Sequence, residues 1–243
     1  MTGSLIVSEL MKIKKTKIWL LPWISPLLAM VITFSLHLPE GLDGHDWRLL
    51  YTMGTSMHAM LLLPLMIGIF SGFVCRYEHQ GGGWKQLFCL PVNRKGIYAA
   101  KYMIVMALVT INQLLLGVFV VAAGFIRGTE GEIPLGFILK SLAGGWAASL
   151  PLAALTLWVA ISWSSFAAPF ALNVILTLPN LLVINSETFG PLYPWAQPAL
   201  MMMPQSEDSF GVFVSMPSMF FAVIASLVIF SLGGLMTIHR KVV

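Results

Sequence analysis

Few side chains in this sequence could do chemistry, and those within its long apolar runs include no carboxylate. Five polar residues stand out there: His58, Asn112, Gln113, Asn173 and Asn180. Polar groups inside a membrane can line a transport path, and they can also join helices through hydrogen bonds. Because His58 has no carboxylate partner within any apolar run, a proton relay is disfavoured. We favour the helix-joining role for each residue and keep the transport path as the alternative.

Catalytic signatures are absent from the sequence. It contains no G-x-x-x-x-G-K-[ST] loop to hold ATP phosphates and no H-E-x-x-H pair. No His, Cys and carboxylate residues have the spacing of metal ligands, and no strand is expected before the glycines at 81–83, so these do not form a dinucleotide loop. Cys75 and Cys89 flank a segment that we place in the cytoplasm, where thiols stay reduced. We therefore expect no enzyme activity, no metal and no cofactor in this chain itself.

Long apolar helices must position the remaining residues. The chain has 243 residues, of which 58% are hydrophobic and only 10% charged, and its mean hydropathy is +0.85. A spanning helix needs about 20 mostly apolar residues. We expect such helices at 18–38, 49–74, 98–125, 139–163, 167–184 and 212–238. The sequence thus predicts an all-α membrane protein with six transmembrane helices in a single domain, 1–243, whose first helix remains as an anchor.

The basic residues predict how these helices are oriented. If both termini are cytoplasmic, eleven of the 14 Lys and Arg residues lie on the cytoplasmic side and eight of the ten acidic residues lie outside. This distribution follows the positive-inside rule for a plasma-membrane protein. The net charge of +4 then reflects these membrane flanks, and nucleic-acid binding is not expected.

Two cytoplasmic segments are expected to be helical. Residues 1–17 place Leu5, Ile6, Leu10 and Ile13 at roughly helical spacing beside several lysines, which predicts an interfacial helix or, alternatively, a plain basic flank. The loop at 76–96 carries Trp84, Leu87 and Phe88 on one edge of a short helix that Pro91 ends. This helix either lies on the lipid headgroups or inserts its apolar edge into a cytosolic partner.

The second of these segments resembles the ABC-2 class of ABC transporter permeases. In that class the second span is followed by a Glu, a Gly pair, an apolar-edged coupling helix and a P-[VI]-[ST]-R-x-x-[IL]-Y-x-x-K stretch. The matching residues here are Glu78, Gly82, Gly83, Trp84, Lys85, Leu87, Leu90, Pro91, Val92, Arg94, Ile97, Tyr98 and Lys101, with Asn93 in place of Ser or Thr. The start SELMKIKKTKIWLL is also similar to these permeases.

The resemblance implies partners and a coupling site. It implies a separate cytosolic ATPase subunit, which holds ATP and Mg, and a second permease that is identical or homologous. The residues that would couple this chain to the ATPase are Glu78, Gly82, Gly83, Trp84, Lys85, Leu87, Phe88, Pro91 and Arg94. Among these, Trp84, Leu87 and Phe88 would fill a groove on the ATPase, and Lys85 would face its rim.

The segment FGPLYPWAQPALMMMP is similar to the lantibiotic-immunity permeases of Gram-positive bacteria, with bacitracin-resistance permeases as close relatives. This resemblance implies an exporter that expels an antimicrobial peptide for self-protection. The segment lies in an outer loop, 185–211, that we expect to be re-entrant or interfacial. Candidate substrate-path residues are His58, Asn112, Gln113, Asn173, Tyr193, Trp195, Met201, Met202 and Met203. A plain interfacial loop with packing methionines is the alternative.

Other functions remain open from the sequence. The chain could export another amphiphile, or it could be a membrane assembly factor or a sensor subunit with no transport role. An intramembrane enzyme is disfavoured because no paired catalytic groups are present.

Overall fold

The computed structural model describes residues 2–14, 16–35, 47–80, 82–89, 91–129, 131–163, 165–203 and 216–241. Every element in these ranges is helical, which confirms the predicted all-α class. The elements are α1 (Thr2–Lys14), η1 (Lys17–Leu20), α2 (Leu21–Ser35), α3 (Trp47–Met57), η2 (His58–Leu62), α4 (Leu63–His79), α5 (Gly83–Cys89), α6 (Arg94–Ile126), α7 (Leu135–Ser162), α8 (Ala167–Thr177), α9 (Asn180–Val183), α10 (Gln197–Met202) and α11 (Met216–Arg240).

Within the described ranges, five helical stretches are long and apolar enough to cross a membrane. They are Lys17–Ser35, Trp47–His79, Arg94–Ile126, Leu135–Ser162 and Met216–Arg240. The fifth predicted run, 167–184, is a shorter apolar helix, Ala167–Val183, interrupted by a turn at Leu178 and Pro179. The predicted count of six spans therefore stays a prediction. The expected ends at 36–38 and 212–215 lie outside the described residues.

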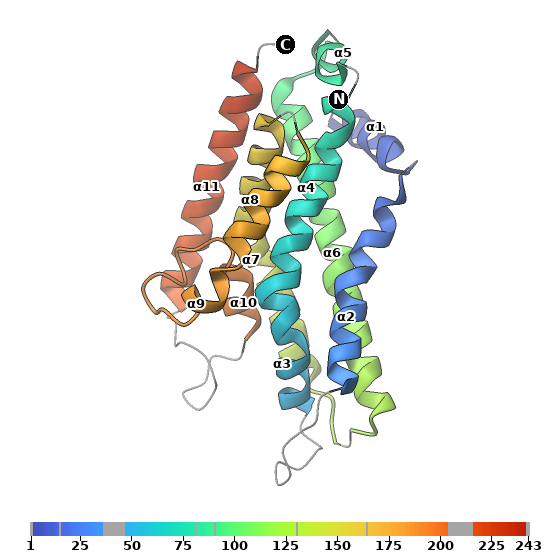
Figure 1. Ribbon diagram of the computed structural model, residues 1–243, viewed down its shortest axis with the longest axis vertical. Coiled ribbons are helices and arrows are strands. Elements are labelled where there is room, and N and C mark those ends of the chain that lie inside the picture. Colours follow the sequence, from blue (N-terminus) through green and yellow to red (C-terminus); the bar gives the residue numbers. More distant parts are fainter. Residues whose placement is uncertain are drawn as a thin grey trace.

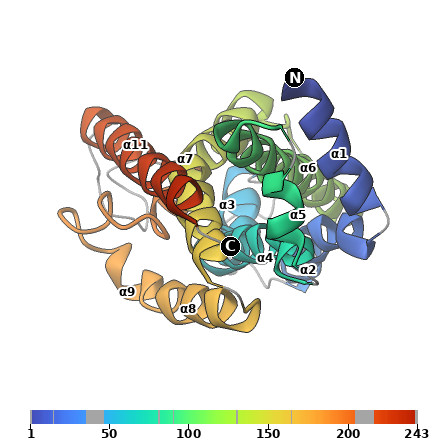
Figure 2. The same ribbon diagram turned by 90° about the horizontal axis from the view of Figure 1, so that it is seen from above.

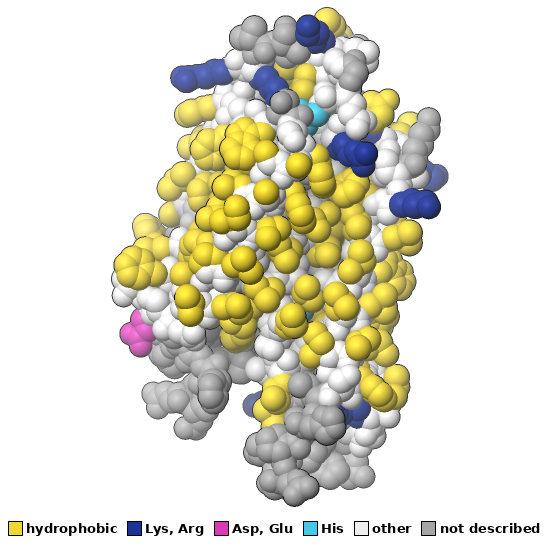
Figure 3. All heavy atoms as spheres, in the orientation of Figure 1, with side chains coloured by type: hydrophobic (Ala, Val, Ile, Leu, Met, Phe, Trp, Pro, Cys, Tyr) yellow, Lys and Arg dark blue, Asp and Glu magenta, His cyan; other side chains and the backbone are white. Residues whose placement is uncertain are grey.

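Helix α4 occupies the centre of the bundle. It packs against α2, α6, α7 and α8, while α11 packs on α7 and α2 packs on α6 (Figures 1 and 2). Ile67, Phe70, Leu108 and Leu152 are fully buried in the resulting core. By contrast, α11 exposes a row of apolar side chains that includes Phe221. Hydrophobic side chains cover the middle of the visible face (Figure 3), as expected for a surface that contacts lipid.

One end of the bundle brings together α1, α5 and the carboxyl end of α11 (Figure 1). Most Lys and Arg side chains visible in Figure 3 also lie toward this end. Helix α1 runs across the outside of α6 rather than along the bundle (Figure 2), and it buries Glu9 and Ile13 while exposing Val7 and Met11. Its direction suits a helix that lies along a membrane surface.

The loop after α9 does not hang away from the bundle. Residues 194–200 are all buried, and α10, which begins at Gln197, packs on α7 and on the π-helical turn η2. Residues 194–203 of the predicted outer loop therefore fold back against the bundle, while Phe189 and Leu192 before them stay exposed. A backbone of this kind is tolerated at membrane depth only where protein covers it.

Candidate functional site

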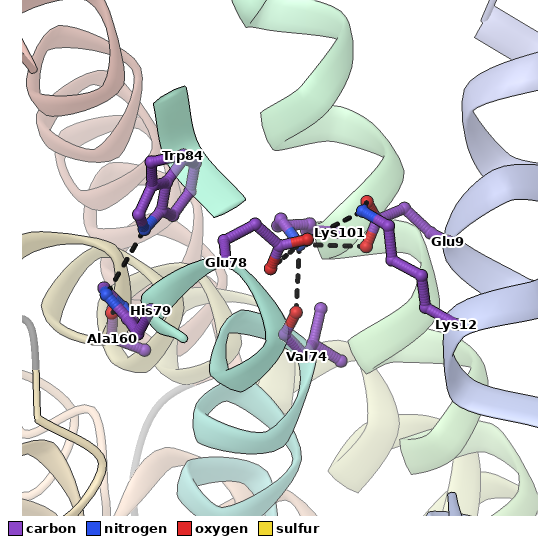
Figure 4. Close-up of polar contacts among 8 residues, drawn as sticks. All are labelled: Glu9, Lys12, Val74, Glu78, His79, Trp84, Lys101 and Ala160. Atoms are coloured by element: carbon purple, nitrogen blue, oxygen red, sulfur yellow. Dashed lines mark hydrogen bonds and ion pairs between the residues drawn. The ribbon is translucent and has the colours of Figure 1, made fainter. Parts of the chain in front are cut away.

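Helix α5 is fixed to the bundle through Trp84. Its indole is only 4% exposed, and its Nε1 donates to Nδ1 of His79 over 3.2 Å. Since an indole N–H can only donate, Nδ1 must accept and Nε2 of His79 carries the proton. That Nε2 donates to the carbonyl of Ala160 over 2.7 Å (Figure 4). Helix α5 is thereby connected to the end of α4 and, through His79, to α7.

A second set of contacts connects α5 to the end of α11. The Arg94 guanidinium lies 4.4 Å from the ring centre of Phe88 and donates to the carbonyl of His239 over 2.7 Å. The Lys241 ammonium lies 4.5 Å from the ring centre of Trp84 and donates to the carbonyl of Ile161. Partial burial lowers the pKa of Lys241. These cations cap free carbonyls at helix carboxyl ends, where positive charge is favoured.

Two glycines bring the chain into α5. Gly82 has φ of +73°, a left-handed conformation that side chains disfavour. A Cβ on Gly83 would lie 2.8 Å from the Cα of Glu78, so no side chain fits between α5 and the end of α4. The positive φ of Gly82 and the close packing at Gly83 thus explain why both positions are glycine.

The Trp84 side chain points toward the bundle. We expected the indole to insert into a groove of a partner, but it is buried against this chain's own helices. A short helix beside a bundle gains most by burying its largest apolar side chain against that bundle. Leu87 and Phe88 are half-buried, whereas Lys85, Gln86 and Cys89 are exposed together with Pro91. The surface of α5 left for a partner is therefore mainly polar.

A buried charge cluster joins three helices beside α5. It comprises Glu9 and Lys12 of α1, Glu78 of α4 and Lys101 of α6 (Figure 4). The Lys101 ammonium, 0% exposed, lies 2.9 Å from Glu9 and 2.7 Å from Glu78. Lys12 lies 2.6 Å from Glu9 and 2.7 Å from Glu78, and Lys101 also donates to the Val74 carbonyl over 2.9 Å.

Each carboxylate of this charge cluster bridges both ammonium groups, so two positive and two negative charges cancel locally. Such burial is costly unless every charge is paired. Sequence reasoning singled out Glu78 and Lys101 through the family pattern but missed Glu9 and Lys12. A signal was present, because Glu9 and Glu78 are the only acids among the residues predicted to be cytoplasmic.

The intramembrane asparagines join helices where prolines leave carbonyls unpaired. Pro26 cannot donate to the carbonyl of Pro22 four residues earlier, and the Asn112 amide donates there over 2.8 Å. Pro64 likewise leaves the carbonyl of Met60 unpaired, and Asn180 donates there over 2.6 Å. The helix-joining interpretation accounts for both asparagines.

The other candidate path residues lie mostly in the interior. Asn173 donates to the Pro64 carbonyl over 3.1 Å and accepts from the Trp195 indole over 2.9 Å. Gln113 donates to the Met202 sulfur over 3.6 Å, beside Gly145, whose missing side chain makes room for Met202. His58 is fully buried, and Tyr193, Met201 and Met203 are half-buried. The methionines of this segment thus lie largely against the bundle, where α10 packs on α7.

We predict that Asn180→Leu lowers the free energy of unfolding by about 1 to 3 kcal/mol, because it leaves the Met60 and Trp195 carbonyls unpaired. Adding Pro64→Ala should recover part of this loss, since residue 64 can then donate to Met60. Thermal unfolding in detergent measures both. The control is Asn185→Leu, which removes an exposed amide; an equal loss from the control would contradict the role given to Asn180.

Apolar helices of this length, in a bundle with a docked helix at one end, define a multi-pass membrane protein. A family model described as ABC-2 family transporter protein matches residues 5–180, well over half of the chain. The chain therefore belongs to the ABC-2 family of transporter proteins. No curated protein matches the chain. Membership in a permease family implies a membrane location and an ATPase partner.

Proposed function

We propose that this chain is the membrane-spanning permease subunit of an ATP-driven exporter, and that α5 docks on a cytosolic ATPase subunit. The main support for the proposal is the attachment of α5 to the ends of other helices. Trp84 and Arg94 connect it to the ends of α4, α7 and α11, while its outer face presents Lys85 and Gln86. A partner that moves α5 would therefore move three helices of the bundle.

The charge cluster extends this connection to α1 and α6. Glu78 directly precedes His79, the residue that binds Trp84. A shift of α5 that displaces His79 also displaces Glu78 and, through it, Lys101 and Lys12. Motion at the docking helix thus reaches α1 and α6 through ion pairs and α7 through a hydrogen bond. This gives ATP-driven movement a physical route into the spans.

The proposed substrate is an amphiphilic peptide of the lantibiotic or bacitracin type. This part of the proposal rests on the resemblance of residues 189–204 to the lantibiotic-immunity permeases. In the described part of this segment, Phe189 and Leu192 are strongly exposed, so they are better placed than Trp195 or Met202 for contact with an apolar substrate. Export of another amphiphile, or a sensor role without transport, are the alternatives that the following experiment separates.

The test of function is a reconstituted complex of this chain with its ATPase in lipid vesicles. We expect the ATPase to bind and its turnover to rise when bacitracin or a lantibiotic is added. Lys85→Glu should weaken ATPase binding about threefold or more, because it reverses an exposed charge at the interface. Lys140→Glu, an exposed lysine at the other end of the bundle, is the matched control. Binding without peptide-stimulated turnover would favour another amphiphile, and no ATPase binding would favour a non-transport role.

We predict that α5 and both termini of the chain lie in the cytoplasm. A Cys75→Ala variant retains the exposed Cys89 on α5, and Cys75→Ala/Cys89→Ala/Glu132→Cys carries one thiol between α6 and α7. An impermeant maleimide should label the second variant in intact cells and the first only after permeabilisation. The reverse pattern would invert the proposed orientation and remove α5 from the reach of a cytosolic ATPase.

A further inference from the structure

A cavity of about 460 Å³ lies between α1, η1, the start of α2 and α4. The elements that line it meet at the end of the bundle that carries α5 (Figure 1). Its wall is largely apolar, formed by Ile13, Ile18, Leu21, Phe73 and Val74. A volume of this size is typical of small-molecule sites, which span about 300 to 1,000 Å³.

Basic side chains surround this apolar wall. Lys12, Lys17 and Arg76 line the cavity, and among the described lining residues Glu9 is the one carboxylate. Glu9 and Lys12 are already paired within the charge cluster. Lys17 and Arg76 are exposed and form no ion pair with any residue that the structure describes. The cavity therefore presents two uncompensated cations beside an apolar surface.

The position of the cavity indicates where an occupant would come from. Its elements are the beginning of one candidate span, which starts at Lys17, and the last turns of another, which ends at His79. This is the level of lipid headgroups, where basic side chains attract anionic lipids. A headgroup phosphate would form ion pairs with the two cations, and the first carbons of an acyl chain would pack against the apolar wall of the cavity. The remainder of the lipid would stay in the bilayer.

We propose that this cavity binds an anionic phospholipid such as phosphatidylglycerol. Its phosphate lies between Lys17 and Arg76, and its upper acyl chain packs against Ile18 and Phe73. Because Glu9 belongs both to the cavity wall and to the charge cluster, the bound lipid braces α1 against α4. Lipid binding in this cavity is independent of the proposed transport function.

The test is lipid retention by the purified full-length chain in neutral detergent, measured by native mass spectrometry. The chain should retain phosphatidylglycerol over phosphatidylcholine by about tenfold or more, since each basic side chain near a headgroup contributes several-fold. The double variant Lys17→Gln/Arg76→Gln should lose most of this preference. Lys14→Gln/Lys95→Gln removes the same charge from exposed positions outside the cavity and should keep it. An equal loss from the control pair, or no preference in the original chain, would overturn the proposal.

Two further measurements use the unaltered chain and identify the occupant. Phosphatidylglycerol with a photoactivatable acyl chain should cross-link within 16–21 or 73–80, the segments that contribute lining residues from η1, α2 and α4. Cross-links confined to other helices, such as α11, would overturn the site. Millimolar inorganic phosphate should not displace the lipid, because it lacks an acyl chain. Displacement by phosphate alone would assign the cations to a soluble anion and contradict a lipid site.

Discussion

Replacing Lys101 by methionine is expected to release α1 from the bundle and to lower the free energy of unfolding by about 3 to 5 kcal/mol. Lys101 is fully buried and lies between Glu9 and Glu78. Without its ammonium, Lys12 alone must compensate two carboxylates. Thermal unfolding in detergent gives the overall loss, and protease sensitivity of the segment between α1 and α2 reports the release of α1.

Charge balance separates this effect from simple loss of packing. Adding Glu78→Gln to Lys101→Met restores a neutral cluster, in which Glu9 still pairs with Lys12 over 2.6 Å. We expect the double variant to recover at least half of the lost stability. Lys95→Met, on the same helix but exposed, is the control and should change stability by less than about 0.5 kcal/mol. If Lys101→Met behaves like this control, the charge cluster does not hold α1.

Much of the helical architecture can be predicted from the sequence, because the length of an apolar run depends only on neighbouring residues. Four of the six expected runs recur in long helices whose ends differ by several residues, and the first recurs in η1 and α2. The second run was expected to end at Val74, whereas α4 continues to His79. The apolar run ends where the charged residues Arg76 and Glu78 begin. Glu78 can nevertheless remain in a buried helix, because the Lys101 ammonium pairs with its carboxylate.

The interruption near Pro179 was harder to foresee. The run 167–184 is one apolar segment in the sequence. In the structure the chain turns at Leu178 and Pro179, and the Asn180 amide after this turn donates to the Met60 carbonyl of η2. That turn is stabilised by the Met60 carbonyl, which Pro64 leaves unpaired and which lies far away in the sequence. A proline indicates where a helix can break, but the partner that favours the break is set by tertiary packing.

The candidate site was predictable in its location and not in its contacts. The glycine pair and the motif around Arg94 placed a short helix between two spans, and the structure has α5 there. The charge cluster could not be derived, because it joins residues 9, 12, 78 and 101 from three helices. The direction of Trp84 was also undetermined, since either face of a seven-residue helix can turn toward the bundle.

Trp84→Ala is expected to separate ATPase docking from the spans. The substitution removes the hydrogen bond to His79 and the ring contacts with Phe88 and Lys241. Truncating a buried tryptophan costs about 3 to 5 kcal/mol, but here the loss falls on α5, a short helix at the end of the bundle. We therefore expect the spans to stay folded while α5 becomes loosely attached, which hydrogen exchange of residues 83–89 would show.

In the reconstituted complex, this loosening should reduce ATPase binding and peptide-stimulated turnover by about tenfold or more, since about 1.4 kcal/mol corresponds to a factor of ten. The loss arises because α5 must first be reordered, although the indole itself does not touch the partner. Trp84→Phe is the matched variant, because it keeps the ring contacts and removes only the donor to His79. It should retain most of the binding and lose part of the stimulation, since His79 connects α5 to α7. If Trp84→Ala increases exchange at α5 but leaves binding and stimulated turnover unchanged, the ATPase contacts the permease elsewhere and α5 is not the coupling helix.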